Sequence, residues 1–392
     1  MKNQSAPQYL AADRHSTSKQ TSLQRKLTTS VAGAVAASAA FPLFSVGKSH
    51  GSHPKVSPLT GDVKLSMPAR DLSSEQLGFI RDLGVEYAQL QASPGAPAYA
   101  ADGHVVPRES DHSSPNGPWN VPQIRLIKER VESFGLKLRH LMMHDFRNAI
   151  LGRPGRDQDI ENVQKSIRVA AEVGIPIVEY NWFALRAQPG YYRVPGRPGM
   201  EYLAFDYDRI KDLPPFPDIG EHSAEELWER YEYFLKAVIP VAEEVGVRMA
   251  VHPNDPPPPV YRGCEQILGS VEGLKRLINI VSSPSNGITW HTGVMNEVGG
   301  DPIKLIPYFM KNDQINHIHF RNVRVEVPRL KYTEVLIDEG DVDMARALRT
   351  LREYGYSRLL FPDHVPHMDS DVERGKVGWS YAAGYIKGLM NS

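Results

Sequence analysis

Four side chains that could bind a metal ion share one sequence context, because each directly follows a short apolar run. They are His252 after Met-Ala-Val, His291 after Ile-Thr-Trp, His319 at the end of His-Ile-His, and Asp363 after Leu-Phe-Pro. Three imidazoles and a carboxylate suit Mn²⁺ or Fe²⁺, and less strongly Zn²⁺, because Ca²⁺ and Mg²⁺ prefer all-oxygen ligand sets. A single histidine is more often a hydrogen-bonded core or surface residue, so the prediction depends on the agreement among four segments.

These four segments contain the last four of eight apolar, β-prone runs along the chain. The runs alternate with amphipathic helical stretches, which is typical of successive βα units. Eight parallel strands close a barrel, so we predict an α/β fold, a (β/α)8 TIM barrel, over residues 51–392. The predicted strands are Val63–Met67, Val85–Leu90, Leu136–Met143, Ile175–Tyr180, Val247–Val251, Gly287–Trp290, Ile315–Phe320 and Arg358–Phe361. The predicted helices are Ser73–Leu83, Val121–Phe134, Ile160–Val173, Ala224–Glu244, Val271–Val281, Asp301–Lys311 and Asp341–Tyr354.

A barrel would bring the four candidate ligands together, because the carboxyl ends of its strands meet at one mouth. Two long connections also leave strands at this mouth, Gln91–Pro118 and Trp182–Gly220. Connections of this length shape a pocket or lid, or are surface additions. Side chains alternate along a strand, so His317 and His319 face the same way. We predict that His319, nearer the strand end, is the ligand and that His317 lies one barrel layer lower.

The composition fits a globular enzyme that acts on a small molecule. Hydrophobic residues make up 41% and charged residues 23% of the 392 residues, which is enough to bury a large core. The 45 basic and 46 acidic residues nearly cancel, so no net field attracts a nucleic acid or an anionic membrane. We therefore expect no nucleic-acid partner and no stable membrane insertion. The single cysteine, Cys264, excludes an intrachain disulfide and a multi-cysteine metal site.

Residues 1–50 resemble a targeting segment rather than part of the barrel. The basic pair Arg25-Lys26 precedes an uncharged, Ala-rich run from Leu27 to Val46, and Ala37-Ser38-Ala39 is similar to a signal cleavage site. The run is only mildly apolar and Pro42 interrupts it, which disfavours a membrane anchor. We expect an exported, periplasmic protein with a Sec- or Tat-like signal peptide, or a cytoplasmic protein if this leader is a disordered tail.

Over residues 63–390 the sequence resembles the mannonate dehydratase family, metal-dependent enzymes with a xylose isomerase-like barrel. His252-Pro253-Asn254-Asp255-Pro256 is similar to the family's His-Pro-Asp-Asp-Pro segment, and His319-Phe320-Arg321-Asn322 matches its His-Phe-Arg-Asn motif. Other matching segments are Tyr180-Asn181, Glu334, Gly340-Asp341-Val342-Asp343-Met344 and Pro362-Asp363-His364. The resemblance implies that His252, His319 and Asp363 are metal ligands and that His364 is the catalytic acid and base.

The sequence departs from the family pattern at three positions. Where the family has Cys-Thr-Gly, this chain has His291-Thr292-Gly293, which keeps a metal-binding side chain and removes one negative charge. The family's His after Glu334 is replaced by Ile337, and the Tyr expected after the Asp-His pair has only Tyr381 as a loose counterpart. These departures concern the substrate more than the fold.

The implied reaction is loss of water from a sugar acid, D-mannonate going to 2-keto-3-deoxy-D-gluconate, a step of glucuronate catabolism. A divalent ion bound to the substrate carboxylate would stabilise the charge that accumulates when the adjacent proton is removed. We expect His364 to shuttle this proton, because an imidazole pKa of about 6.5 suits acid and base chemistry at neutral pH. Tyr381 is the predicted second catalytic residue.

Five further residues at the predicted mouth have two alternative roles each. Arg321 could pair with the substrate carboxylate in catalysis, or form an ion pair that locks the rim. Asp255 could contact the substrate, or fix the proline-rich loop around it. Asn181, Asn322 and His144 are candidates for substrate binding, although short polar side chains at strand ends also cap turns.

Two other functions stay open on the sequence alone. A sugar isomerase or epimerase on the same barrel would use a similar metal, with paired carboxylates drawn from Glu179, Glu334 and Asp363. A non-catalytic carbohydrate-binding barrel would keep the fold without turnover. A small sugar acid is the expected partner of a dehydratase, and assembly into a homo-oligomer is left open.

Overall fold

The computed structural model describes residues 55–69, 72–90, 118–144, 146–184, 189–217, 219–371 and 375–392. The predicted leader, residues 1–50, and residues 91–117 of the first long connection lie outside the described residues. Within the described ranges, no helix combines the length and the apolar character needed to cross a membrane.

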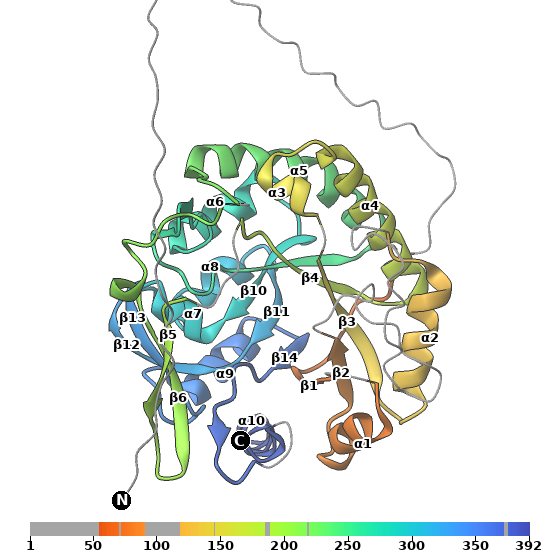
Figure 1. The fold of residues 1–392 in the computed structure, drawn as a ribbon. Coiled ribbons are helices and arrows are strands. Elements are labelled where there is room, and N and C mark those ends of the chain that lie inside the picture. The colour runs from red at the N-terminus through yellow and green to blue at the C-terminus, as the bar shows by residue number, and fades with distance from the viewer. Residues whose placement is uncertain are drawn as a thin grey trace, which may run out of the picture. The chain divides into compact units, whose positions relative to one another are not determined.

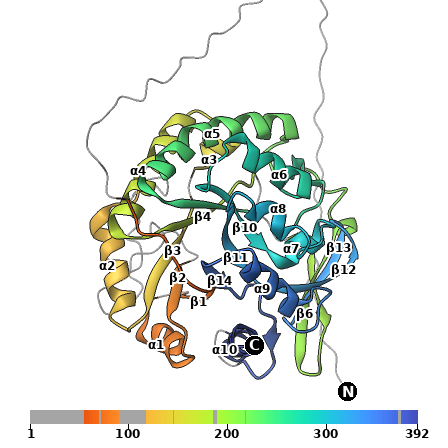
Figure 2. The same ribbon diagram turned by 180° about the vertical axis from the view of Figure 1, so that it is seen from behind.

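Eight parallel strands form a closed barrel, as Figures 1 and 2 show from opposite sides. The order around the barrel is β1-β14-β11-β10-β7-β4-β3-β2, and β1 pairs with both β14 and β2. Each strand overlaps one of the eight predicted runs, so the predicted TIM barrel is confirmed. The strands are β1 (Lys64–Pro68), β2 (Tyr87–Leu90), β3 (Lys137–Met143), β4 (Ile177–Asn181), β7 (Arg248–His252), β10 (Asn286–His291), β11 (Ile315–His319) and β14 (Leu359–Phe361).

Helices alternate with these strands, and local signals fix their ends. The Ser223 hydroxyl accepts the backbone N–H of Glu226, whose carboxylate accepts the N–H of Ser223, so a capping box starts the long helix α5. The same helix ends at Gly246, whose φ of 74° is open to glycine without strain. Seven helices overlap the predicted ones: α1 (Ser74–Asp82), α2 (Val121–Glu132), α4 (Arg156–Val173), α5 (Ala224–Val245), α6 (Val271–Ile280), α8 (Ile306–Met310) and α9 (Met344–Glu353).

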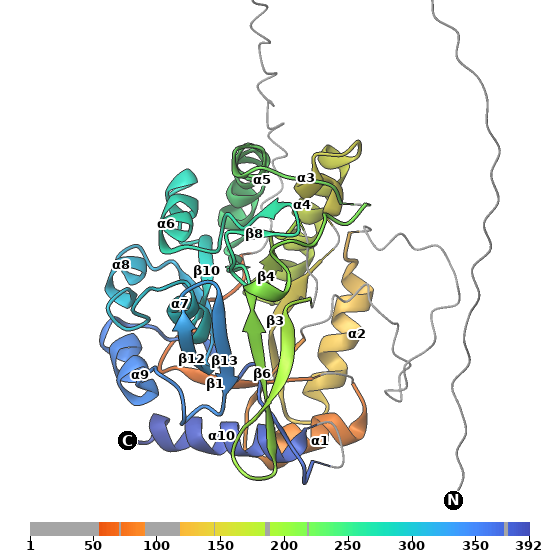
Figure 3. The same ribbon diagram turned by 60° about the vertical axis from the view of Figure 1, so that its left-hand side comes forward.

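Three helices were not predicted: α3 (Arg147–Leu151), α7 (Thr292–Glu297) and α10 (Lys376–Met390). The first two have five and six residues, too few to show a helical period. Helix α10 begins at Gly375 without a side-chain cap and contains three glycines, which weaken the helical signal. It lies beside β1 and runs along α1: the Lys376 ammonium pairs with Glu75 at the start of α1, and the Lys387 ammonium donates to the carbonyl of Leu83 at its end (Figure 3).

A second sheet, antiparallel, extends from the carboxyl ends of the barrel strands, and it corrects one prediction. The long connection Trp182–Gly220, for which the sequence predicts no strand, carries the hairpin β5–β6. Strand β6 also pairs with β13 and β15, so that segments following β4, β11 and β14 share one sheet (Figure 3). Its strands are β5 (Tyr191–Pro195), β6 (Met200–Asp206), β12 (Asn322–Val327), β13 (Lys331–Val335) and β15 (His367–Met368); the 3-10 helix η1 (Tyr207–Arg209) follows β6, and β8 (Val260–Tyr261) with β9 (Cys264–Glu265) forms a separate pair.

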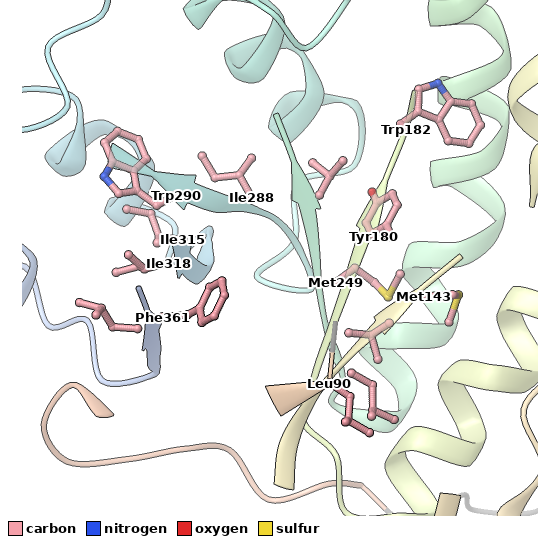
Figure 4. Close-up of a cluster of buried hydrophobic side chains, with 14 of the residues drawn as sticks. Leu90, Met143, Tyr180, Trp182, Met249, Ile288, Trp290, Ile315, Ile318 and Phe361 are labelled. Carbon is pink, nitrogen blue, oxygen red and sulfur yellow. The ribbon is translucent and has the colours of Figure 1, made fainter. Parts of the chain in front are cut away.

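The barrel interior is layered, because alternate residues of a strand face the same side. The lowest layer is apolar and consists of Tyr87, Ile177, Ala250 and Leu359, packed against Leu59. Two residues further along β4 the interior becomes polar at Glu179, which is fully buried. The strand residues that alternate with these inward-facing ones point outward, toward the helices. They belong to the large apolar core, of which Figure 4 shows Tyr180, Met249, Ile288 and Trp290.

The close strand packing near Gly287 generates a stability prediction. A Cβ atom at this position of β10 would lie 2.5 Å from the backbone carbonyl oxygen of Gln314, which cannot move without distorting β11. Gly287→Ala should therefore lower the free energy of unfolding by about 1–3 kcal/mol, measured by urea denaturation. Gly384→Ala is the matched control, because nothing lies within 4 Å of its added Cβ in helix α10. It should be neutral or stabilising by up to about 1 kcal/mol, and equal losses in both variants would contradict the packing argument.

Candidate metal centre

The four candidate ligands lie together at the carboxyl end of the barrel. One donor atom from each of His252, His291, His319 and Asp363 can be chosen so that all four atoms lie within 4.8 Å of one another. Oδ2 of Asp363 is 3.0 Å from Nε2 of His291 and 3.2 Å from Nδ1 of His319. All four side chains are buried. The histidines end β7, β10 and β11, and Asp363 follows β14, so barrel closure alone brings them together.

Hydrogen bonds to the backbone orient two of the imidazoles. Nδ1 of His252 donates to the carbonyl of Pro253 at 2.7 Å, which leaves the lone pair on Nε2. Nδ1 of His291 accepts the N–H of Val294 at 3.2 Å, because His291 is the N-cap of α7, and Nε2 then faces Asp363. His319 is different: although the ring is buried, neither nitrogen has a well-aligned hydrogen bond.

The electrostatics of this cluster favour a cation. Burial and the neighbouring His319 lower the pKa of His252 to about 4, and burial with Arg321 holds the pKa of His291 well below its usual value. Burial also opposes protonation of His319, but Glu179 and Asp363 outweigh it and raise the pKa of this imidazole to about 9. The same two carboxylates that favour a proton on His319 would favour a metal ion. A donor set of imidazole nitrogens and a carboxylate, with Nδ1 of His319 buried and without a hydrogen-bond partner, fits Mn²⁺, Fe²⁺ or Zn²⁺.

A second polar group lies directly beneath this cluster. Oε2 of Glu179 lies 3.0 Å from Nε2 of His140, and Oε1 accepts a hydrogen bond of 2.8 Å from the Thr289 hydroxyl. His317 packs on His140 with ring centroids 4.4 Å apart, which confirms its predicted place one layer lower. All four residues are fully buried. His319 joins the two layers, because its Nε2 is 3.1 Å from Oε1 of Glu179.

His364 forms the outer edge of the cluster. Its φ of 45° lies in the left-handed region, which is uncommon for a residue other than glycine. Nδ1 lies 2.9 Å from Oε1 of Glu334, and Nε2 lies 3.5 Å from Oδ2 of Asp363. Burial lowers the pKa of this imidazole, but Asp363 and Glu334 outweigh that effect and raise it to about 10. Its side chain is 35% exposed against 4% for His319, so it is the accessible imidazole of the group.

Arg321 lies beneath the rim, in a network of carboxylates. Only 2% of the residue is exposed. Nη2 is 3.0 Å from Oδ2 of Asp255 and 3.7 Å from Oε1 of Glu334, and Nη1 is 2.7 Å from Oε1 of Glu297. Burial raises the pKa of Glu297 to about 8, with Arg321 acting in the opposite direction. The guanidinium therefore already faces three carboxyl groups of the protein. This favours the role of an ion pair that locks the rim over that of a free guanidinium that binds the substrate carboxylate.

Gly293 makes room for this guanidinium. A Cβ atom there would lie 2.6 Å from Nη1 of Arg321. On the other side, Asp255 accepts from the Tyr191 hydroxyl at 3.1 Å and from the Tyr332 hydroxyl at 3.4 Å. The Asp255 carboxylate thus has three partners within the protein, which favours its loop-fixing role.

Two predicted site residues lie away from the metal-binding cluster. The amide nitrogen of Asn322 donates to the carbonyls of Ile337 and Val342 at 2.9 and 3.0 Å, and its oxygen accepts the Val342 N–H at 3.1 Å. These bonds use the amide of Asn322 to hold the loop that contains Ile337 and Val342, so the amide is not directed at a substrate. Tyr381 lies on the outer helix α10, where its hydroxyl donates to Asp338 at 2.8 Å. Both positions therefore disfavour the predicted roles in substrate binding and catalysis.

Asn181 and His144 lie at the mouth itself. Asn181 pairs in register with His252 of the neighbouring strand, and His144 directly follows β3. Both are half-buried, so their place is compatible with contact to a small ligand.

The sequence did not point to four of the polar residues described here: His140, Thr289, Glu297 and Tyr191. The available signal was the two-residue period of strands, which places Thr289 directly below His291 and Glu179 directly below Asn181. Glu297 and Tyr191 carried no such signal, because one lies in a short helix and the other in a hairpin for which the sequence predicts no strand.

Comparisons with known proteins agree on one family. The family model described as D-mannonate dehydratase (UxuA) matches residues 96–216 and 198–392. The mannonate dehydratase of Streptococcus pneumoniae (strain 70585) is 32% identical over 306 residues, covering 70% of this chain and 83% of the relative. The crystal structure of mannonate dehydratase from Streptococcus suis serotype 2 has a TM-score of 0.71 at 27% identity, covering 84% of this chain and 94% of that one. A xylose isomerase domain protein from Alicyclobacillus acidocaldarius, at 12% identity and a TM-score of 0.52, shares the fold.

The buried network around Arg321 generates a second prediction. Arg321→Met should lower the free energy of unfolding by about 3–5 kcal/mol in urea denaturation, because it leaves buried carboxylates without a counterion. Adding Asp255→Asn should recover part of this loss. Burial raises the pKa of the Asp255 carboxyl, but Arg321 outweighs that effect and holds it below its usual value, so Asp255 is the ionised partner that the amide makes neutral. Arg324→Met, at an exposed position of β12, is the control and should change stability by less than about 0.5 kcal/mol. A loss at Arg321 no larger than the control's would contradict the counterion role.

Proposed function

The chain belongs to the mannonate dehydratase family, and we propose that it converts D-mannonate to 2-keto-3-deoxy-D-gluconate at a divalent metal ion held by His252, His291, His319 and Asp363. Family membership makes it a carbon–oxygen hydro-lyase that acts on a sugar acid. The identity of the substrate, of the product and of the metal, Mn²⁺ or Fe²⁺ before Zn²⁺, is part of the proposal.

One observation carries the proposal: four metal-binding groups meet within 4.8 Å at the barrel mouth, with a partly exposed imidazole beside them. The donor set supports a resident cation. The position of His364, next to Asp363 and open to solvent, supports an acid–base role in the same site.

The proposed chemistry divides between the ion and the chain. Dehydration removes the proton from the carbon next to the carboxylate and the hydroxyl from the following carbon, so one group must accept a proton and one must supply a proton to the leaving hydroxyl. When bound, the divalent ion supplies Lewis-acid stabilisation of the negative charge that develops on the substrate carboxylate. We assign both steps to Nε2 of His364, since Nδ1 is engaged with Glu334: it accepts the proton from the carbon and then gives it to the leaving hydroxyl, which departs as water.

We assign the remaining rim residues to positioning and binding. Arg321 holds Asp255 and Glu334 in place, and Glu334 in turn orients His364. Asn181 and His144, at the ends of β4 and β3, are the proposed contacts for the hydroxyl groups of the sugar acid.

The donor set also separates this proposal from an isomerase or epimerase with paired carboxylates at the metal. Of the three carboxylates that could form such a pair, Glu179 lies in the layer beneath and Glu334 is directed at His364, which leaves Asp363 in the cluster. A non-catalytic carbohydrate-binding barrel would not turn over any sugar acid, so chelator-sensitive turnover distinguishes it. Export through residues 1–50 stays a proposal drawn from the sequence.

Removing a ligand should remove the metal. His252→Ala and Asp363→Ala should remain folded but lose stoichiometric Mn²⁺ or Fe²⁺, measured by elemental analysis of the purified proteins and by loss of activity. His367→Ala, which changes an exposed histidine on β15, should keep both. Unchanged metal content in both ligand variants would place the metal site elsewhere.

Changing His364 should separate chemistry from metal binding. His364→Asn should keep the metal but lower kcat for D-mannonate dehydration by about 10²- to 10⁴-fold, because the group that moves the proton is gone. The assay is formation of the 2-keto-3-deoxy acid, with isomerised or epimerised sugars measured in the same samples. A kcat within a factor of about two of the parent enzyme would rule out this role for His364. An isomerised or epimerised product in place of the keto acid would instead refute the proposed reaction.

A further inference from the structure

Glu179 is a carboxylate buried in the middle of the barrel, where no part of it reaches solvent. Burying an ionised carboxylate is costly unless hydrogen bonds and opposite charges compensate. Its compensation comes from three different strands: His140 on β3, Thr289 on β10 and His319 on β11. Because an apolar residue could fill the same space without the desolvation cost of a carboxylate, we expect Glu179 to have a role beyond packing.

The contact with His319 links Glu179 to the metal-binding cluster. Nδ1 of His319 faces Asp363 at 3.2 Å, and Nε2 faces Oε1 of Glu179 at 3.1 Å. A neutral imidazole carries one proton, so a ring that gives the Nδ1 lone pair to a metal keeps its proton on Nε2. The acceptor facing that proton is Glu179. Such pairing of a ligand imidazole with a buried carboxylate fixes the ring orientation and strengthens the ligand.

The Glu179 carboxylate is itself held against rotation. Oε1 accepts from the Thr289 hydroxyl at 2.8 Å, and Oε2 lies 3.0 Å from Nε2 of His140. Because the two oxygens are bound by residues of strands on either side of β4, Oε1 stays aimed at His319. Thr289 and His291 lie on the same face of β10, so one strand supplies both a predicted ligand and a support for the carboxylate.

We propose that Glu179, held by His140 and Thr289, is a positioning residue that orients His319 for metal binding from the layer beneath. This inference rests on the metal site of the proposed function and adds a residue to it. It predicts that the charge of Glu179 sets the metal affinity without itself contributing a ligand.

An alternative use of the same residues is a second metal site formed by His140, Glu179 and His317. The rings of His140 and His317 are tilted by 34° to each other, with centroids 4.4 Å apart. One observation weighs against a second metal site. Both Glu179 oxygens already face donors. Metal stoichiometry separates the two cases.

The test is Mn²⁺ binding to metal-stripped protein, followed by the electron paramagnetic resonance signal of free Mn²⁺. Glu179→Gln should bind Mn²⁺ about 10- to 100-fold more weakly than the parent protein, with the stoichiometry unchanged at one ion per chain. Asp159→Asn is the matched control, because it also converts a buried carboxylate to an amide. Asp159 lies in α4, outside the barrel interior, and accepts the backbone N–H of Ala149 in α3 at 3.1 Å. Its Mn²⁺ affinity should equal that of the parent.

Each other outcome overturns a defined part of the argument. Equal affinities in Glu179→Gln and the parent overturn the positioning role. Two ions in the parent and one in Glu179→Gln overturn it in favour of a second metal site. A parent protein that binds no Mn²⁺ or Fe²⁺ refutes the metal site of the proposed function first. If Glu179→Gln does not fold, Thr289→Val removes one support of the carboxylate; it should weaken binding about 2- to 10-fold, and unchanged affinity overturns the role.

Discussion

The Asp363 carboxylate is the contact on which the mouth of the barrel depends. Its Oδ2 lies within 3.5 Å of three imidazole nitrogens, those of His291, His319 and His364. A buried carboxylate needs such partners, and the partners come from different strands, so the charge balance exists only when β14 closes the barrel between β11 and β1. Folding and assembly of the site are therefore one event. The proposed cation would enter a position that the barrel has already shaped.

Around Arg321 the arrangement of charges is the reverse of that around Asp363. The inner cluster gathers imidazoles around one carboxylate, whereas the rim gathers Asp255, Glu297 and Glu334 around Arg321. The two groups meet at His364, which contacts a carboxylate of each. An imidazole in that position is held from both sides, while a third of its surface stays open. The arrangement explains why an arginine next to a ligand histidine in the sequence is a counterion in the structure.

The sequence predicted the parts of this site that depend on strand ends. Apolar runs followed by His or Asp are visible in the chain, and barrel geometry brings such residues together regardless of their separation. The role of Arg321 could not be decided in the same way, because it depends on Glu297, which lies in the short helix α7. Glu179 was recognised only as a possible ligand. A polar residue inside an apolar strand does not reveal which neighbours it meets across the barrel.

The antiparallel sheet at the mouth has a consequence for how such an enzyme can diverge. In barrels of this kind, the loops after the strands commonly vary one by one. Here β6, β13 and β15, which follow three different barrel strands, are joined by backbone pairing. Lengthening one of these segments would disturb the register of the other two. Exchange of single side chains on this shared sheet would leave that pairing intact, whereas grafting one loop would break it, so the three segments constrain one another.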